Sequence, residues 1–228
     1  MTVTVSVIIP AIDEAEVVGA AVSSAIRARA DEVILVDGGS RDATARIAEE
    51  HGAVVLTASP GRASQQAAGA QAAKGDVLLF LHADCCLPLD GLEEIRQQMA
   101  DCELVKGGYF RQRIDHAGWI YRCIEYGNGF RARILKWAYG DQAIFVRSRV
   151  YHAIGGFPPM PLMEDLYFMK RLKYEGRLIC IQTALVVSAR RWLKRGTIRQ
   201  TLRNWAMLVA VHLGVSPHTL ARFYPRTT

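Results

Sequence analysis

Apolar and polar residues follow one another in blocks along the first hundred positions. Four apolar runs are short and rich in β-branched residues, a pattern typical of strands buried on both faces of a parallel sheet. They span residues 3–9, 32–36, 53–57 and 76–81. Segments with helical patterning follow them, at residues 13–29, 43–51, 62–74 and 90–99. Four strand–helix repeats predict an α/β fold with a mostly parallel central sheet flanked by helices.

The second half of the chain is less regular. Strands are expected over residues 103–113, with a break at Gly107 and Gly108, and over 143–147 and 178–187. Helices are expected over residues 119–137, 164–175, 197–213 and 217–223. No linker-like or low-complexity tract interrupts the sequence. We therefore expect one domain over residues 1–228 that ends in a helical elaboration.

Three polar clusters directly follow predicted strands of the first half. They are Asp13 with Glu14, the segment 37–42, and His82 with Asp84. Ligands of parallel α/β sheets bind outside the carboxyl ends of the strands. The three clusters should therefore line one crevice, which predicts a binding site. Asp13 and Glu14 are also expected to open the first helix, because its dipole favours acidic residues in the first turn.

Asp37 stands at a strand end before Gly38 and Gly39, which let the backbone turn sharply and approach a ligand. Asp37 could cap the next helix, but Ser40 can supply that cap, so Asp37 is expected to face a ligand. The sequence has no GxGxxG after its first strand and no GxxxxGK[ST]. Dinucleotide-binding dehydrogenases and P-loop NTPases are thereby disfavoured.

Other charged residues point to diphosphate and metal chemistry. Asp84 could hold Mg²⁺, which proteins bind through one or two carboxylates plus phosphates. His82 is a softer ligand, better suited to Mn²⁺ or Zn²⁺. Arg62 opens a helix whose N-terminus is already positive, so a phosphate partner would explain it. Glu164 and Asp165 could satisfy a helix dipole, or one of them could act as a general base towards an acceptor hydroxyl.

The formal net charge is +6, and basic residues crowd into positions 190–203 around Trp192. This stretch is either a solvated helix face or a phosphate-facing loop. The five cysteines show no CxxC spacing, which argues against disulfides and zinc ribbons. The N-terminus lacks a signal peptide's basic region, and no apolar run reaches membrane-spanning length. We expect a cytoplasmic protein, with peripheral contact at the inner membrane face through the basic C-terminal segment.

Taken in order, these clusters resemble glycosyltransferase family 2, whose members have the GT-A fold. Four segments carry the resemblance: VIIPAIDEA at the first strand, DGGSRD at 37–42, GDVLLFLHAD at 75–84, and GGF at 155–157 followed by Glu164 and Asp165. Two departures stand out. His82 replaces the first Asp of the family's DxD metal motif, and Arg190, Arg191 and Trp192 follow Ser188 and Ala189 where QxxRW begins with Gln. The absence of that Gln and of membrane spans implies transfer of a single sugar.

The resemblance implies a nucleotide-binding half (1–100), an acceptor half (101–190) and C-terminal helices (191–228). It implies an inverting, metal-assisted transfer from a nucleotide-sugar, UDP-sugar being favoured, to a small-molecule or lipid-linked acceptor hydroxyl, with Mg²⁺ or Mn²⁺ and without nucleic acid. The implied roles are as follows: catalytic, Asp165 as base with Glu164 and Arg191; nucleotide-binding, Pro10, Ala11, Glu14, Asp37, Gly38, Arg62, Ala83 and Asp84; metal, Asp84 and His82; acceptor region, Gly140, Asp141, Gln142 and Trp192.

Within the family, four segments resemble the small soluble transferases associated with radical-SAM and selenodomain proteins, of the arsenosugar-biosynthesis type. The segments are GRASQQAAGA, YGDQAIFVR, PLMEDL and SARRW. Two other classes stay open. A sugar-phosphate nucleotidyltransferase shares the architecture, although the acidic segment after the first strand disfavours it. A non-catalytic nucleotide-sugar binding protein would use the basic C-terminal segment.

Overall fold

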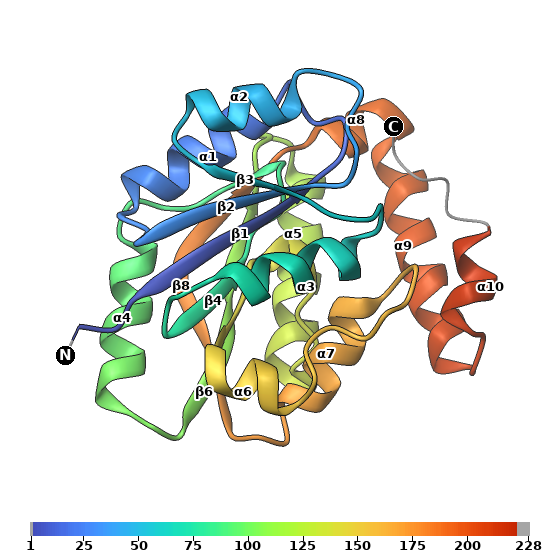
Figure 1. Ribbon diagram of the computed structural model, residues 1–228. Coiled ribbons are helices and arrows are strands. Elements are labelled where there is room, and N and C mark those ends of the chain that lie inside the picture. Colours follow the sequence, from blue (N-terminus) through green and yellow to red (C-terminus); the bar gives the residue numbers. More distant parts are fainter. Residues whose placement is uncertain (1, 223–228) are drawn as a thin grey trace.

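The computed structural model describes residues 2–222 and consists of one eight-stranded sheet with helices on both faces (Figure 1). The strand order is β3-β2-β1-β4-β7-β6-β8-β5. Strands β1 to β4 pair in parallel, whereas β7 runs antiparallel between β4 and β6. The sheet is thus mixed and mostly parallel, as predicted. Among residues 2–222, no helix combines the length and apolar character needed to cross a bilayer.

The strand–helix alternation of the first half is confirmed. Its elements are β1 (Val5–Ala11), α1 (Val18–Arg27), β2 (Glu32–Asp37), α2 (Thr44–Glu50), β3 (Val54–Thr57), α3 (Arg62–Ala72) and β4 (Val77–Phe80). Alternate residues of each strand enter two apolar layers, as a sheet buried on both faces requires. In β1, Val7 and Ile9 pack towards α1 and α4, whereas Ile8 packs towards α3 and α7.

The remaining elements include the expected ones and three short ones that sequence patterning misses. The elements are β5 (Cys85–Cys86), α4 (Gly91–Asp101), β6 (Val105–Ile114), α5 (Trp119–Leu135), η1 (Gly140–Gln142), β7 (Ile144–Arg147), α6 (Ser148–Ala153), α7 (Glu164–Leu172), β8 (Arg177–Val187), α8 (Arg190–Arg195), α9 (Thr197–His212) and α10 (Pro217–Ala221). β5, η1 and α6 are the unexpected ones, and α8 lies in the basic stretch for which the sequence left a helix or a loop open. The predicted end of the last helix, Phe223, lies outside the described residues.

The prediction that Asp13 and Glu14 open the first helix is wrong, because α1 begins at Val18. Asp13 adopts a positive φ of 52°. Its carboxylate accepts a hydrogen bond from the Arg41 N–H (2.7 Å), and the Glu14 N–H donates to Thr44 Oγ1 (2.8 Å). These bonds to the loop after β2 keep both residues outside the helix.

The expected break at Gly107 and Gly108 is also absent, since β6 is continuous through both residues. A Cβ atom added to Gly107 would lie 2.4 Å from the carbonyl oxygen of Phe145, and one on Gly108 would lie 2.2 Å from that of Ile179. The glycines therefore let the neighbouring strands approach closely instead of ending the strand.

Candidate active site

The loop after β2 is ordered by its own carboxylates. Asp37 accepts hydrogen bonds from the N–H groups of Gly39 and Ser40, at 3.1 Å each, and from the Ser40 hydroxyl. The next helix begins at Thr44, whose N–H donates to Asp42 (2.9 Å). The prediction that Ser40 caps this helix is therefore wrong. Asp37 shapes a compact turn at the carboxyl end of β2, where a nucleoside was expected.

The ends of β1 and β2 are joined by a residue that sequence patterning missed. The side-chain amide of Gln65, on α3, donates to the carbonyl oxygens of Ala11 and Val36, at 2.8 Å each. Pro10 lies beyond the last residue pair between β1 and β4, Ile8 with Phe80. A proline tolerates this place, because the pairing with β4 has already ended and the missing N–H interrupts no residue pair with that strand. In the sequence, Gln65 stands out only as an amide side chain within an alanine-rich helix.

Two adjacent arginines of α8 contact the ends of different strands. Arg190 forms an ion pair with Glu14, after β1, and Arg191 Nη2 lies 3.0 Å from Asp84 Oδ2, after β4. Burial opposes the charged form of Asp84, but Arg191 and its neighbours outweigh it, and the pKa of Asp84 is lowered. The two arginines therefore face the strand ends, whereas Lys194 on the same helix is exposed.

His82 is buried, and within residues 2–222 its Nε2 atom has no hydrogen-bond partner. A Cβ atom on Gly140 would lie 2.2 Å from that nitrogen, so the glycine backbone packs directly against the ring. Burial lowers the pKa of His82 to about 3, and Arg62 adds to the shift. The imidazole is therefore neutral at physiological pH. Ala83, the next residue, packs in the apolar core.

Glu164 and Asp165 begin α7, as predicted, but both are buried. Asp165 Oδ2 accepts a hydrogen bond from the Gly140 N–H (2.8 Å). Glu164 Oε1 lies 3.6 Å from Arg62 Nε. Burial raises the pKa of Glu164, with Arg62 opposing the shift and Asp165 adding to it. Gly140 thus touches His82 through its α-carbon and Asp165 through its amide.

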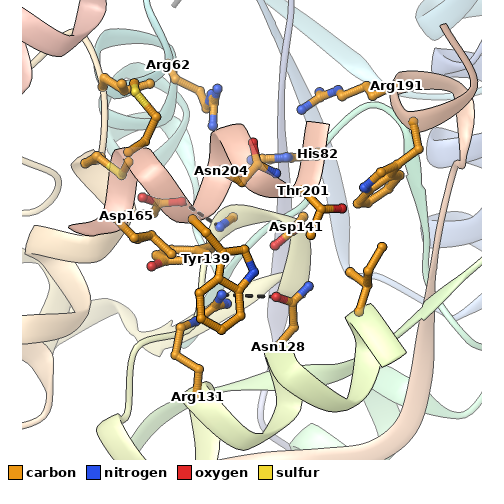
Figure 2. Close-up of a pocket in the computed structure, with 18 residues that line it drawn as sticks. Arg62, His82, Asn128, Arg131, Tyr139, Asp141, Asp165, Arg191, Thr201 and Asn204 are labelled. Atoms are coloured by element: carbon orange, nitrogen blue, oxygen red, sulfur yellow. Dashed lines mark hydrogen bonds between the residues drawn. The ribbon is translucent and has the colours of Figure 1, made fainter. Parts of the chain in front are cut away.

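A cavity of about 150 Å³ opens at this point, between η1, α5, α7 and α9 (Figure 2). It brings together seven of the predicted residues: Arg62, His82, Gly140, Asp141, Asp165, Arg191 and Trp192. The others lie outside its lining: Pro10, Ala11, Glu14, Asp37, Gly38, Ala83, Asp84, Gln142 and Glu164. Five polar lining residues were not predicted individually: Asn128, Arg131, Tyr139, Thr201 and Asn204. Helix α9 therefore covers the cavity.

The cavity floor contains polar groups whose bonding capacity is not used. Asp141 Oδ2 accepts from Gln112 (3.0 Å), but its buried Oδ1 has no partner among the described residues, and neither has the Tyr139 hydroxyl. Burial raises the pKa of Asp141, with Arg131 opposing the shift and Asp165 adding to it. The Arg131 guanidinium stacks 3.8 Å above the Tyr139 ring. Buried polar groups of this kind are normally satisfied by a ligand or by water.

The fold and this site define a transferase of the GT-A type, and comparison with known proteins gives the family. The model of glycosyl transferase family 2 matches residues 6–153, so the chain belongs to glycosyl transferase family 2. No curated protein sequence matches the chain.

Several solved structures share the fold. TarS of S. aureus is 15% identical with a TM-score of 0.68, the match covering 81% of this chain and 36% of TarS. Glucosyl-3-phosphoglycerate synthase from Mycobacterium tuberculosis is 18% identical with a TM-score of 0.60, covering 80% of this chain and 70% of the synthase. A mycobacterial protein is 17% identical with a TM-score of 0.58, covering 82% of this chain and 65% of that protein. The chain thus spans less than two thirds of TarS and of the mycobacterial protein.

Proposed function

We propose that this chain is an inverting glycosyltransferase that moves one sugar from a nucleotide-sugar to an acceptor hydroxyl in a single displacement. One observation carries the proposal. Gly140 contacts His82, next to Asp84 at the end of β4, and also binds the carboxylate of Asp165. Gly140 would therefore lie between the donor diphosphate at the strand ends and the general base that faces the acceptor.

The donor would lie on the sheet side of Gly140. The nucleoside would contact Pro10, Ala11, Glu14, Asp37, Gly38 and Ala83, and the diphosphate would meet Arg62, Asp84 and Arg191. Arg191 would stabilise the negative charge that grows on the leaving nucleotide. UDP is the favoured nucleotide. Its support is that TarS forms a complex with UDP-GlcNAc, and the mycobacterial synthase with UDP.

The acceptor would enter the cavity between η1 and α9, near Gly140, Asp141, Gln142 and Trp192. Asp165 would take the proton from the acceptor hydroxyl as that oxygen attacks the anomeric carbon on the face opposite the diphosphate, which inverts the configuration. Glu164 supports this step indirectly, because its buried carboxyl group pairs with Arg62 at the donor side.

A divalent cation fits this donor set in one way only. Within residues 2–222 no three acidic, histidine or cysteine side chains gather into a metal cage. The backbone of Gly140 packs against His82 Nε2, so this nitrogen is not open to a metal ion. Asp84 would therefore hold Mg²⁺ or Mn²⁺ together with the donor's diphosphate oxygens, the usual mode for Mg²⁺. Such a cation supplies positive charge that stabilises the departing nucleotide.

The test incubates the protein with UDP- and GDP-sugars and Mn²⁺ and measures free nucleotide. Release of UDP or GDP that Asp84→Ala abolishes, and that the exposed-site control Asp101→Ala retains, is the expected result. When pyrophosphate is added, formation of a nucleoside triphosphate together with a sugar 1-phosphate would instead identify a sugar-phosphate nucleotidyltransferase. Binding without turnover across a broad acceptor screen would identify a non-catalytic nucleotide-sugar binding protein.

The narrower assignment, to the transferases associated with radical-SAM and selenodomain proteins, stays a prediction. It rests on the four segments that resemble that subgroup, all of which border the cavity: Arg62 lies in the first, Gly140 and Asp141 in the second, Asp165 in the third, and Arg191 and Trp192 in the fourth. The expected cytoplasmic location is likewise a prediction.

A further inference from the structure

Helix α9 exposes a continuous apolar stripe. The stripe consists of Ile198, Leu202, Trp205, Val209 and Leu213 at its end, which are between 54% and 79% exposed. Their spacing places them on one side of a helix. The opposite side already serves the core, since Met207 and Val211 pack with Leu166 of α7. The outward stripe is therefore not needed for packing α9 onto the domain.

Helix α5 carries a second stripe with the same spacing. Trp119, Cys123, Tyr126, Phe130 and Ile134 are all exposed, and the four large side chains are between 60% and 78% exposed. Monomeric proteins rarely leave so many large apolar groups on adjoining surfaces without an interaction partner. We call the two stripes together the α5–α9 face.

An apolar groove runs between the two helices. Ile120, Cys123 and Ile124 line it from α5, and Ile198, Leu202 and Trp205 line it from α9. The groove has a volume of about 270 Å³. It shares Ile124, Thr201 and Trp205 with the cavity that contains Asp165. An apolar chain in the groove would therefore continue directly to the polar cavity.

The surroundings of this face are positively charged. After Glu175 the sequence has no acidic residue. Lys194 and Arg199 are exposed and Arg195 is half-buried, on α8 and α9, and Arg133 and Lys136 are exposed at the end of α5. Two such faces would repel each other in a dimer. An apolar stripe with a basic border matches the surface of an anionic bilayer.

We propose that the α5–α9 face docks on an anionic lipid surface and that the acceptor is an amphiphile drawn from that surface. Its apolar chain lies in the groove, and its hydroxyl-bearing head enters the cavity towards Asp165. This inference rests on the proposed function, and it names the acceptor class of that site. The contact is interfacial, because the apolar stripes lie along the helix sides and no described helix spans a bilayer.

The experiment measures sedimentation of the full chain with vesicles of phosphatidylcholine, with and without an equal part of phosphatidylglycerol. Partitioning is expected only with the anionic vesicles, and it should weaken at high salt. Leu202→Glu should lower partitioning about tenfold or more, because a leucine leaves the apolar phase and a like charge meets the anionic lipid. Leu104→Glu, at an equally exposed leucine before β6, is the matched control and should partition normally.

A charge series tests the basic border. The triple variant Lys194→Gln, Arg195→Gln, Arg199→Gln should lower partitioning on the order of a hundredfold, since each cation near an anionic surface contributes about fivefold. The matched triple Arg46→Gln, Lys74→Gln, Arg149→Gln removes three cations from other surfaces and should change it little. Circular dichroism of each variant verifies folding.

Three outcomes would overturn the proposal. These are no sedimentation with anionic vesicles, equal loss in the control variants, and a dimer in analytical ultracentrifugation that Leu202→Glu dissolves. Nucleotide release from sugar donors in lipid-free buffer is measured on the same samples. If Asp84-dependent release persists while vesicles bind nothing, the docking inference fails and the proposed function stands. If the protein sediments with anionic vesicles but turns over no sugar donor, the proposed function fails and the docking inference stands.

Discussion

Carboxylates have different surroundings in two regions at the same edge of the sheet. The first is the loop after β2 that contains Asp37, which we call the Asp37 corner, and the second is the segment around Gly140, which we call the Gly140 corner. At the Asp37 corner, Asp37 accepts hydrogen bonds from Gly39 and Ser40, and Asp42 accepts from Ala15 and Thr44. The pKa of Asp42 is lowered because its bonds outweigh its desolvation. At the Gly140 corner, Glu164 is buried and Asp141 half-buried, and each has a buried oxygen without a hydrogen bond among the described residues. Burial raises the pKa of both.

The two corners differ in how far their hydrogen-bonding groups are satisfied by the described residues. The Asp37 corner is ordered by the chain alone, so it can receive a rigid ligand without rearranging. The Gly140 corner stores unused donors and acceptors, whose burial costs free energy until a partner supplies the missing bonds. We therefore assign chemistry to the second corner and shape recognition to the first.

The largest expected effect is at Asp165. Asp165→Asn keeps the shape and an oxygen that can accept from the Gly140 N–H, but removes the base. We expect glycosylation of an acceptor to slow about 10²- to 10⁴-fold. Steady-state turnover measures this, with Asp101→Asn as the exposed control. Near-normal turnover of the Asp165 variant would refute the assignment of the base.

Gly140→Ala is expected to disturb the contact between the two sides of the site. The new methyl group would meet the His82 ring at 2.2 Å, and such overpacking costs about 1–3 kcal/mol of unfolding free energy. Urea unfolding measures the loss. Gly129→Ala on α5, where nothing lies within 4 Å, is the matched control and should be neutral or stabilising. If His82→Ala does not relieve the cost in the double variant, the ring is not the cause.

Asp37→Ala should act mainly on stability. It removes the acceptor for the N–H groups of Gly39 and Ser40, which we expect to cost about 1–2 kcal/mol of unfolding free energy. Asp37→Asn retains one acceptor and should cost less. Unfolding in urea gives both values, and donor titration on the folded variants gives the effect on nucleotide affinity. A fully stable Asp37→Ala variant would contradict the assigned role in the loop.

The smallest effect concerns pH. Because the folded pKa of Asp141 is raised from its usual 3.8, its contribution to stability is greatest below that value and is lost as pH rises through the raised pKa. Asp141→Asn removes this titration and can still accept from Gln112. The variant should therefore gain stability relative to the original chain as pH rises, and the difference should then level off. Urea unfolding across the acidic to neutral range measures it, and a pH-independent difference would speak against the burial of the charge.

The sequence predicts the strands and helices of the first half well, because continuous apolar runs leave few other structures open. It places the start of α1 wrongly, since the bond from Arg41 to Asp13 and the bond from Glu14 to Thr44, and not the helix dipole, decide where Asp13 and Glu14 lie. It misses β5, because two residues are too short to form a pattern.

For the site, the rule that ligands bind at strand ends brings Glu14 and Asp84 to the same edge, as expected. The pairing of these residues with Arg190 and Arg191 could not be read from the sequence, because the partners lie far apart along the chain. Asn128 and Asn204 were missed for a related reason. A polar residue on a half-buried helix resembles any solvated one until the fold shows which side faces the cavity.

The two-residue strand β5 has a consequence for how the protein is made. Cys85 and Cys86 pair with the end of β8, and the Ser188 N–H donates to the Asp84 carbonyl oxygen (3.0 Å), so that α8 begins beside Asp84. On the ribosome, Asp84 emerges about a hundred positions ahead of Arg191. We expect a chain that has not yet reached Arg191 to bind sugar nucleotides poorly, which would protect activated sugars from wasteful hydrolysis until that residue has been synthesised.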